Sequence, residues 1–331
     1  MRAVVVARPG GPEQLVVREV PDPVPGPGEV LLEVHAAGLN NADLLQRRGL
    51  YPPPAGASDV PGLEVAAVVA AVGPPDDAAP GDTPTPAPGD RVVALLPGGG
   101  YAERAVVDAG LTLPWPEHLS AAEAAVLPEA LATAWSNLEV AHARPGERLL
   151  VRGGSGGVGT LAVQLGRALG LEVLATAGGP DRVARVRDLG VPTVLDHRAD
   201  ELVEQVLTAT GGAGVDVVLD VVGAAALADN LAVLAPDGRL VVIGLQGGTR
   251  AELDLGLLLS RRLSVAGTSL RSRPLAQRRA VVAGLRAHVW PHVVDDTLRP
   301  CLHAALPLDR ADEAHRTLEA GGVFGSLALE V

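Results

Sequence analysis

The sequence predicts an α/β protein, in which a doubly wound parallel sheet of six strands is joined to a second, β-rich domain. Two observations carry this prediction. The first 120 or so residues contain only short strand-like runs separated by prolines and glycines, whereas strands and helices alternate from about Ala121 onward. The segments between the later strands are about 12–20 residues long, as right-handed β-α-β crossovers require. Such crossovers build a doubly wound sheet.

The N-terminal strands are expected where apolar, β-branched residues are bounded by turn-forming residues. They are residues 4–7, 15–20, 30–37, 65–72 and 91–96. Between the last two, residues 73–90 are rich in proline and aspartate. This composition predicts a solvated surface loop, to which we assign no chemistry.

The strands of the parallel sheet are expected at residues 147–153, 171–177, 193–197, 215–222, 239–245 and 263–268. Two helices, residues 274–288 and 308–320, and a final strand, residues 326–331, follow this sheet. This tail is too short to form a domain of its own, so we expect it to complete the N-terminal domain. The predicted domains are therefore 1–122 with 271–331, and 123–270.

A glycine motif follows the first strand of the predicted sheet. Gly154, Gly156 and Gly159 have the spacing G-x-G-x-x-G and lead into the apolar, helix-like segment 161–169. The first glycine permits a tight turn, the second lets backbone N–H groups approach a pyrophosphate, and the third allows the helix to pack against the strand. Because a strand, a helix and another strand surround the motif, it predicts dinucleotide binding.

The composition excludes several classes of protein. The 331 residues carry a formal charge of −12, with arginines scattered among the acids, which argues against nucleic acid or an anionic membrane as the main partner. Cys301 is the only cysteine, so neither an internal disulfide nor a thiolate zinc site can form. The chain shows no run of about 20 apolar residues and no basic, then apolar N-terminal leader. We expect a soluble, cytoplasmic protein.

Five segments resemble the medium-chain dehydrogenase/reductase superfamily and, within it, the zinc-free quinone oxidoreductases. The last two listed here are similar to the subgroup that a tumour suppressor induces in animals. The segments are AGLNNADLLQRRGLYP (37–52), PGLE (61–64), SGGVGT (155–160), LLPGGGYAE (95–103) and TSLRSR (268–273). The resemblance implies a GroES-like catalytic domain, a Rossmann dinucleotide-binding domain and reductase activity.

The resemblance also implies that the catalytic zinc is absent. Zinc alcohol dehydrogenases of the superfamily have cysteine where this chain has Asn40, and histidine where it has Leu63. Leucine cannot bind a metal and asparagine binds zinc poorly. Without a Lewis acid, a substrate that delocalises negative charge itself, such as a quinone or an α,β-unsaturated carbonyl, is the expected hydride acceptor.

Five candidate catalytic residues follow from the resemblance, each with a structural alternative. Asn40 would hydrogen-bond the substrate carbonyl, or cap the helix at 42–48. Asp43 and Arg47 would shape the floor of the active site, or form an i,i+4 ion pair. Tyr51 would bond the carboxamide or pass a proton, or pack a loop. Thr133 would face the nicotinamide, or bond its own helix backbone.

The cofactor is expected to be NADPH, with NADH as the alternative. NAD enzymes present an acid at the end of the second strand, but this strand ends at Ala177-Gly178-Gly179. Arg182 on the next helix would pair with a 2′-phosphate, and His197 stands where relatives often have tyrosine. Asp181 either favours NADH or only stabilises the first turn of the helix. The expected cofactor contacts are Gly154, Ser155, Gly156, Gly157, Val158, Gly159, Thr160, Gly178, Arg182, His197, Gly223, Gly244, Leu245, Leu270, Phe324 and Gly325.

Two other functions stay open at this point. An enoyl-thioester reductase would use the same fold and hydride chemistry, and Arg271 and Arg273 leave room for a carrier or coenzyme A. A non-enzymatic, NADPH-binding or RNA-associated role is disfavoured by the acidic charge and the scarcity of aromatic residues. We also expect a homodimer that pairs the edge strands 263–268 of two copies, because this strand contains no proline or charged residue that would prevent pairing.

Overall fold

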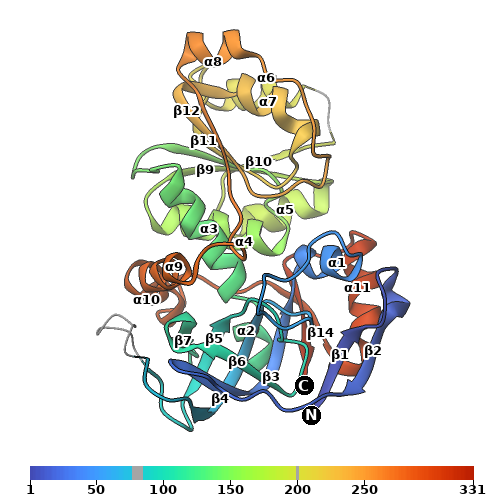
Figure 1. Ribbon diagram of the computed structural model, residues 1–331. Coiled ribbons are helices and arrows are strands. Elements are labelled where there is room, and N and C mark those ends of the chain that lie inside the picture. The colour runs from blue at the N-terminus through green and yellow to red at the C-terminus, as the bar shows by residue number, and fades with distance from the viewer. Residues whose placement is uncertain (77–84, 199–200) are drawn as a thin grey trace. The chain divides into compact units, whose positions relative to one another are not determined.

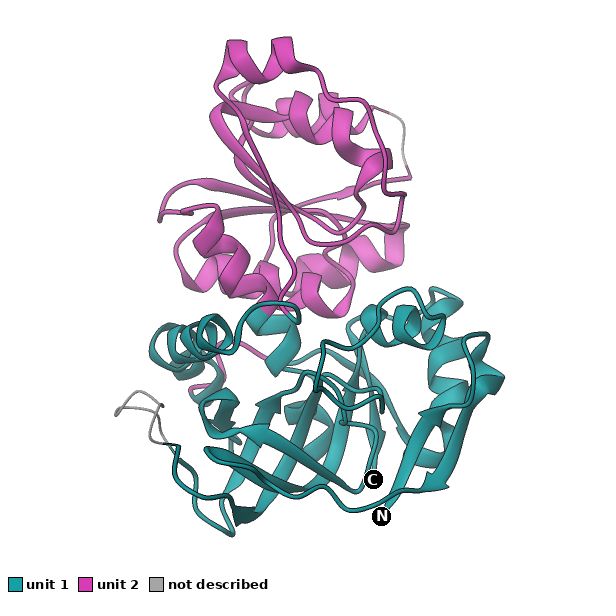
Figure 2. Ribbon diagram, in the orientation of Figure 1, with its two compact units in different colours: residues 1–132, 271–294, 300–331 teal, residues 133–270, 295–299 magenta. Residues whose placement is uncertain are grey.

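The computed structural model describes residues 1–76, 85–198 and 201–331; residues 77–84, part of the expected loop 73–90, lie outside them. The chain forms two compact units (Figure 2). Unit 1 contains residues 1–132, 271–294 and 300–331, and unit 2 contains residues 133–270 and 295–299. The sequence placed the first division after residue 122, whereas here it falls inside helix α3 (Pro128–Val140). No helix in the described ranges is long and apolar enough to cross a membrane.

Unit 2 is built on a parallel sheet with the order β10-β9-β8-β11-β12-β13. Its strands are β8 (Arg148–Val151), β9 (Glu172–Ala177), β10 (Thr193–Asp196), β11 (Val215–Asp220), β12 (Leu234–Val242) and β13 (Ser264–Gly267). The prediction of a doubly wound, six-stranded parallel sheet is therefore confirmed. The central strand β8 comes first along the chain, so the strand order reverses there, and ligands bind such sheets at this switch point.

Helices cover both faces of the unit 2 sheet (Figure 1). α4 (Gly157–Ala168) and α5 (Pro180–Asp188) lie on one face. α6 (Leu202–Ala209), α7 (Leu227–Ala232) and α8 (Leu255–Arg261) lie on the other. The core between them is aliphatic: Leu150, Val218 and Leu240 are completely buried. Because aliphatic side chains on both faces of the central strands are covered, these strands read in sequence as continuous apolar runs.

Unit 1 contains a mostly antiparallel, seven-stranded sheet and a separate hairpin of β1 (Arg2–Val6) and β2 (Leu15–Glu19). The sheet comprises β3 (Glu29–Leu39), β4 (Glu64–Val72), β5 (Arg91–Leu95), β6 (Arg104–Asp108), β7 (Thr112–Pro114), β14 (Leu302–Pro307) and β15 (Ser326–Glu330). β15 pairs with β3, so the tail completes the N-terminal sheet as expected. The sequence analysis missed β6, β7 and β14.

The helices of unit 1 are short, apart from α9. They are α1 (Asn41–Arg47), α2 (Ala121–Ala125), α9 (Leu275–His288), α10 (Trp290–Val294) and α11 (Ala311–Glu319). α2 begins with a capping box, in which the Ser120 hydroxyl accepts the Glu123 N–H and the Glu123 carboxylate accepts the Ser120 N–H. Its Ala122 packs with Ala328 of β15, which places α2 against the sheet.

Two of the three tryptophans belong to unit 1. The Trp115 ring lies under the Arg91 guanidinium, 4.0 Å from its centroid, and its indole N–H donates to the carbonyl of Leu119. The indole N–H of Trp290 donates to the carbonyl of Pro114. Trp135, the third, lies on the part of α3 that belongs to unit 2.

Candidate active site and cofactor site

The glycine loop after β8 has the geometry that its spacing predicts. Gly154 and Gly159 are buried, whereas Gly156, the N-cap of α4, is exposed. A Cβ on Gly159 would lie 2.1 Å from the carbonyl oxygen of Gly153, so only glycine lets α4 approach the strand this closely. A Cβ on Gly156 would meet nothing nearer than 3.7 Å, so the backbone is open on that side. The free N–H groups of the first turn of α4 thus face a space suited to a pyrophosphate.

The other residues of this loop support its shape. The Gly153 and Gly154 N–H groups donate to the hydroxyl and carbonyl of Thr176 on β9. Thr160 donates its hydroxyl to the carbonyl of Gly157, within the first turn of α4. Ser155 is 8% exposed. Gly157 and Val158 complete the first turn of the helix.

Basic side chains gather where β9 and β10 end. The Cβ position of Gly178 lies 3.0 Å from the His197 ring and 3.0 Å from Nε of Arg198. The pKa of His197 is lowered by partial burial and by the nearby charges of Arg152, Arg198 and Arg182. Four basic side chains therefore lie near this strand end, together with Asp196, whose carboxylate accepts the Gly179 N–H at 3.0 Å. Arg182 and His197 were predicted from the sequence, whereas Arg198, which directly follows His197, and Arg152, which precedes the glycine loop, were not.

The remaining expected cofactor contacts fall into two groups. Gly223, Gly244 and Leu245 meet at the ends of β11 and β12: the Cβ position of Gly223 lies 3.0 Å from the Leu245 side chain and 3.1 Å from the Gly244 carbonyl. Leu270, 8% exposed, is the last residue of the main segment of unit 2. Phe324 and Gly325 belong to unit 1. Gly325 lies so close to the carbonyl of Cys301 that any Cβ would clash there.

Asn40, Asp43 and Glu64 form a hydrogen-bonded cluster in unit 1. Asn40 is the N-cap of α1, and its N–H donates to Asp43 Oδ2 at 2.8 Å. Its side-chain Nδ2 donates to Glu64 Oε1, also at 2.8 Å. The second Asp43 oxygen accepts the N–H of Gly62. Asn40 therefore serves as the expected helix cap and also holds a buried glutamate.

Glu64 links this cluster to the start of α3. Its Oε2 accepts the N–H of Glu129 at 2.8 Å, a backbone donor that lacks a partner in its own helix. Gly38 makes room for the carboxylate, because a Cβ there would lie 2.2 Å from Glu64 Oε1. The hydrogen-bond donors of Glu64 are therefore the Asn40 side chain and the Glu129 backbone.

Asp43 and Arg47 do not form the ion pair that the sequence offered as an alternative. The Asp43 carboxylate, in the first turn of α1, instead accepts the backbone N–H groups of Asn40 and Gly62. Arg47, 1% exposed, donates to the carbonyl of Gly10, to His315 Nδ1 and to Glu319. The other ring nitrogen of His315 lies 3.2 Å from the Tyr101 hydroxyl. Tyr101 and His315 are far apart in the chain, so no local signal predicted this contact.

Burial shifts the ionisation of this cluster strongly. It raises the pKa of Asp43 to about 6, although the N–H groups of Asn40 and Gly62 act in the opposite direction. It raises the pKa of Glu64 to about 8, and the pKa of Glu129, which also feels the Glu64 carboxylate, to about 8. Burial, with Arg47 nearby, lowers the pKa of His315 to about 3. Near neutral pH the carboxyl groups of Glu64 and Glu129 are therefore protonated, and the imidazole of His315 is neutral.

Tyr51 lies beside the guanidinium of Arg271. The Arg271 carbon Cζ is 5.4 Å from the Tyr51 ring centroid, and Nη1 is 3.4 Å from the Tyr51 carbonyl oxygen. The structure thus brings Asn40, Asp43, Arg47 and Tyr51 into one unit, with Arg271 among them. Thr133 belongs to unit 2, where its carbonyl accepts a hydrogen bond from Asn137.

The residues at the expected metal positions do not fit a zinc ion. Asn40 turns its amide nitrogen, a donor, toward Glu64, and Leu63 is 1% exposed and apolar. Within the described ranges no three His, Cys, Asp or Glu side chains are grouped so that they could hold a metal. We therefore derive no step through zinc.

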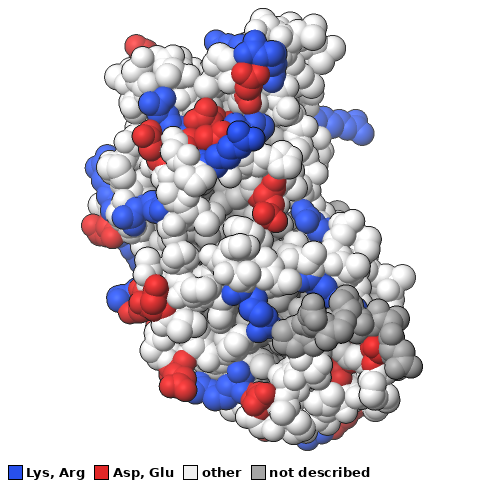
Figure 3. Space-filling model, turned by 90° about the vertical axis from the view of Figure 1, so that its left-hand side faces the viewer, with Lys and Arg blue, Asp and Glu red and all other residues white. Residues whose placement is uncertain are grey.

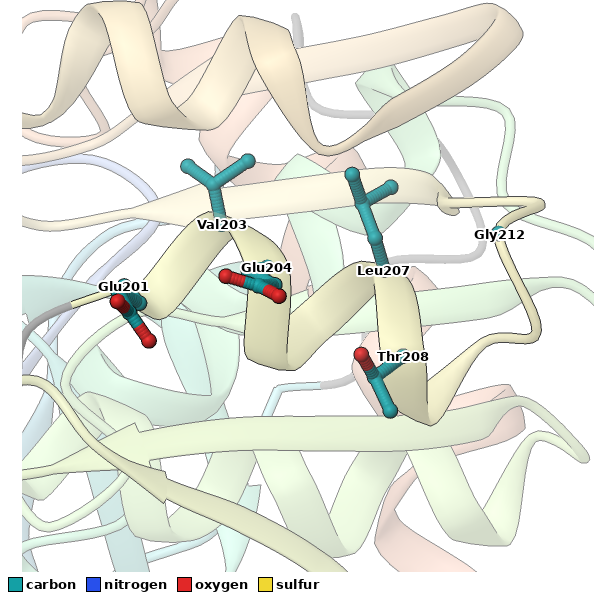
Figure 4. Close-up of a pocket in the computed structure, with 6 residues that line it drawn as sticks. All are labelled: Glu201, Val203, Glu204, Leu207, Thr208 and Gly212. Carbon is teal, nitrogen blue, oxygen red and sulfur yellow. The ribbon is translucent and has the colours of Figure 1, made fainter.

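A surface hollow in unit 2 does not fit the cofactor either. It lies along α6 and is lined by Glu201, Val203, Glu204, Leu207, Thr208 and Gly212 (Figure 4). Its charged groups are two carboxylates, which would repel a dinucleotide phosphate. On the face of the molecule seen in Figure 3, acidic and basic side chains are interspersed, and no large area of one sign is visible.

Comparison with known proteins agrees with this architecture. Residues 26–117 match the alcohol dehydrogenase GroES-like domain family, and residues 157–283 match the zinc-binding dehydrogenase family. Quinone oxidoreductase of Rattus norvegicus is 32% identical over 99% of this chain and 97% of its own. A quinone oxidoreductase from Thermus thermophilus, also solved as a complex with NADPH, has a TM-score of 0.82 and 36% identity, with both chains fully covered.

A different kind of relative is much longer than this chain. A mycocerosic acid synthase-like polyketide synthase of Mycobacterium tuberculosis is 36% identical over 93% of this chain. The chain spans only 14% of that protein.

Proposed function

Because the chain belongs to the zinc-free quinone oxidoreductases of the medium-chain dehydrogenase/reductase family, and so is an oxidoreductase that binds a nicotinamide cofactor, we propose that it reduces quinones or α,β-unsaturated carbonyls with NADPH. The observation that carries this proposal is the donor set of unit 1. Hydrogen-bonding and carboxyl groups stand where a metal-dependent relative needs ligands. Such groups suit an acceptor that delocalises its own negative charge.

The preference for NADPH rests on the strand end after β9. His197 and Arg198 lie next to Gly178, the charge of Arg182 acts on His197, and no carboxylate follows the strand directly in the sequence. A 2′-phosphate would gain charge-assisted hydrogen bonds from these groups, which are stronger than the hydrogen bonds that a 2′-hydroxyl could form.

Bound NADPH supplies the hydride, and the chain provides the surroundings for the acceptor. Asn40 Nδ2 has a second N–H besides the one that Glu64 accepts, and we assign this donor to the substrate oxygen. Asp43 and Glu64 hold Asn40 at its backbone and side chain, so the amide is fixed before substrate binds. We assign proton delivery to the Tyr51 hydroxyl.

Stopped-flow oxidation of NADPH against a panel of quinones, enones and enoyl thioesters tests this proposal. We expect burst or steady-state turnover with at least one quinone or conjugated ketone, and much weaker turnover with NADH. Oxidation of simple alcohols by NADP⁺, with no reduction of conjugated acceptors, would overturn it.

The similarity to a polyketide synthase favours enoyl-thioester reduction as a second candidate. A crotonyl thioester in the same panel separates the two. If the thioester is reduced with a kcat/KM at least about tenfold above that of every quinone, the second candidate replaces the first.

A further inference from the structure

Arg271 is a buried cation whose charge is only partly compensated. The residue is 4% exposed. Its Nε donates to the carbonyl of Pro97 at 2.7 Å, and Nη1 reaches the carbonyl of Tyr51. Nη2 is buried and has no hydrogen-bond partner. Among the described residues Arg271 forms no ion pair, although the Asp43 carboxylate acts on it from a distance.

Two other arginines of unit 1 have a carboxylate partner for the guanidinium. Arg47 pairs with Glu319, and Arg279 pairs with Asp108. An unpaired N–H on a buried cation costs free energy of folding. We therefore expect such a group to be kept where it binds a ligand that is absent from the free protein. The two carbonyls bound by Nε and Nη1 fix the guanidinium plane and leave Nη2 as the only nitrogen without an acceptor.

Nη2 is enclosed by Gly98 and by the Tyr51 segment, residues 49–60. The Cβ position of Gly98 lies 3.3 Å from Nη2 and 2.7 Å from the carbonyl oxygen of Ser58, so the segment closes over the guanidinium in the free protein. The segment contains no helix or strand, so a bound acceptor can take its place beside Nη2. An oxygen atom of a planar conjugated molecule fits this arrangement, since the Tyr51 ring offers a flat apolar surface beside the cation.

We propose that Nη2 of Arg271 binds the carbonyl oxygen of the substrate and stabilises the negative charge that hydride addition places on it. This inference rests on the proposed function and adds a catalytic residue to it. The guanidinium would do by charge-assisted hydrogen bonding what a metal does as a Lewis acid. Since Nη2 is buried in the free protein, the substrate displaces part of the 49–60 segment as it binds.

For an enone, the hydride forms a C–H bond at the β-carbon, and the π electrons move to the carbonyl oxygen, which becomes an enolate oxygen next to Nη2. The Tyr51 hydroxyl, to which we assign proton delivery, then gives its proton to the α-carbon and regains one from water, and the saturated ketone results. NADPH loses two electrons and becomes NADP⁺. For a quinone the same transfer gives a hydroquinone monoanion, which takes its proton on oxygen.

The two acceptors should respond differently to the loss of Arg271. An aliphatic enolate concentrates charge on one oxygen, whereas a hydroquinone anion spreads it into an aromatic ring. With saturating NADPH, Arg271→Gln should lower kcat for an aliphatic enone about 100-fold, the effect of removing one oxyanion donor. It should lower kcat for 1,4-naphthoquinone less than about tenfold. A purely structural role would lower both by the same factor.

Arg278→Gln is the matched control. Arg278 on α9 also has buried guanidinium nitrogens without partners, but it has no hydrogen bond to the Tyr51 or Pro97 carbonyl. We expect it to retain wild-type kcat with both acceptors. If Arg278→Gln and Arg271→Gln lose activity alike, the effect is general electrostatics and the proposal fails. Arg271→Lys, which keeps the charge, serves if Arg271→Gln does not fold.

Chemical rescue gives a second readout. Millimolar guanidinium should restore enone reduction by Arg271→Ala, and urea, which has a similar shape but no charge, should not. No rescue by guanidinium, in a variant that folds and binds NADPH, overturns the proposal.

A binding experiment separates this inference from the proposed function. 4-Nitrophenol bound next to Nη2 should ionise at lower pH than in solution, which its absorbance reports without turnover. The shift should disappear in Arg271→Gln and persist in Arg278→Gln. If wild type reduces no acceptor but shows this shift, the proposed function fails and the oxyanion site stands. If it reduces enones without the shift, the oxyanion site fails alone.

Discussion

The candidate sites of the two units are built from different parts of the chain, backbone groups in unit 2 and side chains in unit 1. In unit 2 the glycine loop offers backbone N–H groups, and what matters is the absence of side chains at Gly154, Gly156 and Gly159. In unit 1 the candidate site consists of side chains, and each is held by a partner from another element, as Asn40 is by Glu64. A backbone site tolerates little change of size, whereas a side-chain site tolerates little change of charge or hydrogen bonding.

The largest effects are expected in the glycine loop. Gly159→Ala places a Cβ 2.1 Å from the Gly153 carbonyl, so it should destabilise unit 2 by about 1–3 kcal/mol or more and abolish cofactor binding. Gly156→Ala meets no atom within 3.7 Å, so it should fold normally yet weaken NADPH binding about tenfold or more. Thermal unfolding and fluorescence titration measure the two effects. Unchanged NADPH affinity in a folded Gly156→Ala variant would show that Gly156 does not face the cofactor.

The next effect concerns assembly, for which we propose a homodimer through β13. Val265 is 42% exposed on this edge strand. Because the Thr268 N–H bonds β12, alternation along a parallel strand turns the Val265 N–H outward. Val265→Pro should therefore convert dimer to monomer while leaving the fold intact.

Light scattering at micromolar concentration measures the oligomeric state of the wild type and of Val265→Pro. Gly267→Ala is the control that should stay dimeric. A monomeric wild type refutes the dimer, and a dimeric Val265→Pro moves the interface elsewhere.

The cofactor preference should change by a moderate factor. Arg198→Ala and Arg182→Ala should each raise the Kd of NADPH about tenfold and leave the Kd of NADH nearly unchanged, since a charge-assisted contact contributes about 1.5–3 kcal/mol. Arg185→Ala, on the same helix as Arg182, tests whether any nearby positive charge suffices. If wild type binds NADH more tightly than NADPH, Asp181 rather than the arginines determines the preference.

Unit 1 should show a smaller, pH-dependent effect. The folded pKa of Glu64, about 8, lies above its ordinary value of 4.5, so the native state holds this proton more tightly. Its contribution to stability is complete below about pH 4.5 and is lost as the pH rises through 8. The melting temperature should therefore fall between pH 6 and pH 8.5, and Glu64→Gln should flatten this slope. An unchanged slope in Glu64→Gln would assign it to other groups.

The smallest expected effect is that of metal removal. The residues at Asn40 and Leu63 supply no zinc site, so prolonged treatment with 1,10-phenanthroline should leave turnover unchanged. Stoichiometric zinc in the purified protein, lost together with activity, would contradict this.

The sequence predicted unit 2 better than unit 1 for a physical reason. A six-stranded parallel sheet consists of locally regular segments, and Gly154, Gly156 and Gly159 are adjacent in the chain. Short strands such as β7, three residues long, carry too few residues for a pattern. Arg47 and Tyr101 both contact His315, which lies more than 200 residues away from each of them in the chain. Such contacts are set by the fold, which is also why Arg198 and the free nitrogen of Arg271 emerged only from the structure.

The scarcity of aromatic residues makes the protein optically simple. Its three tryptophans are divided between the units, with Trp115 and Trp290 in unit 1 and Trp135 in unit 2. Replacing Trp135 alone would leave emission that reports only on unit 1, and replacing the other two would isolate unit 2. Each half of the molecule can then be followed separately by fluorescence during unfolding, ligand titration or rapid mixing, without an added label.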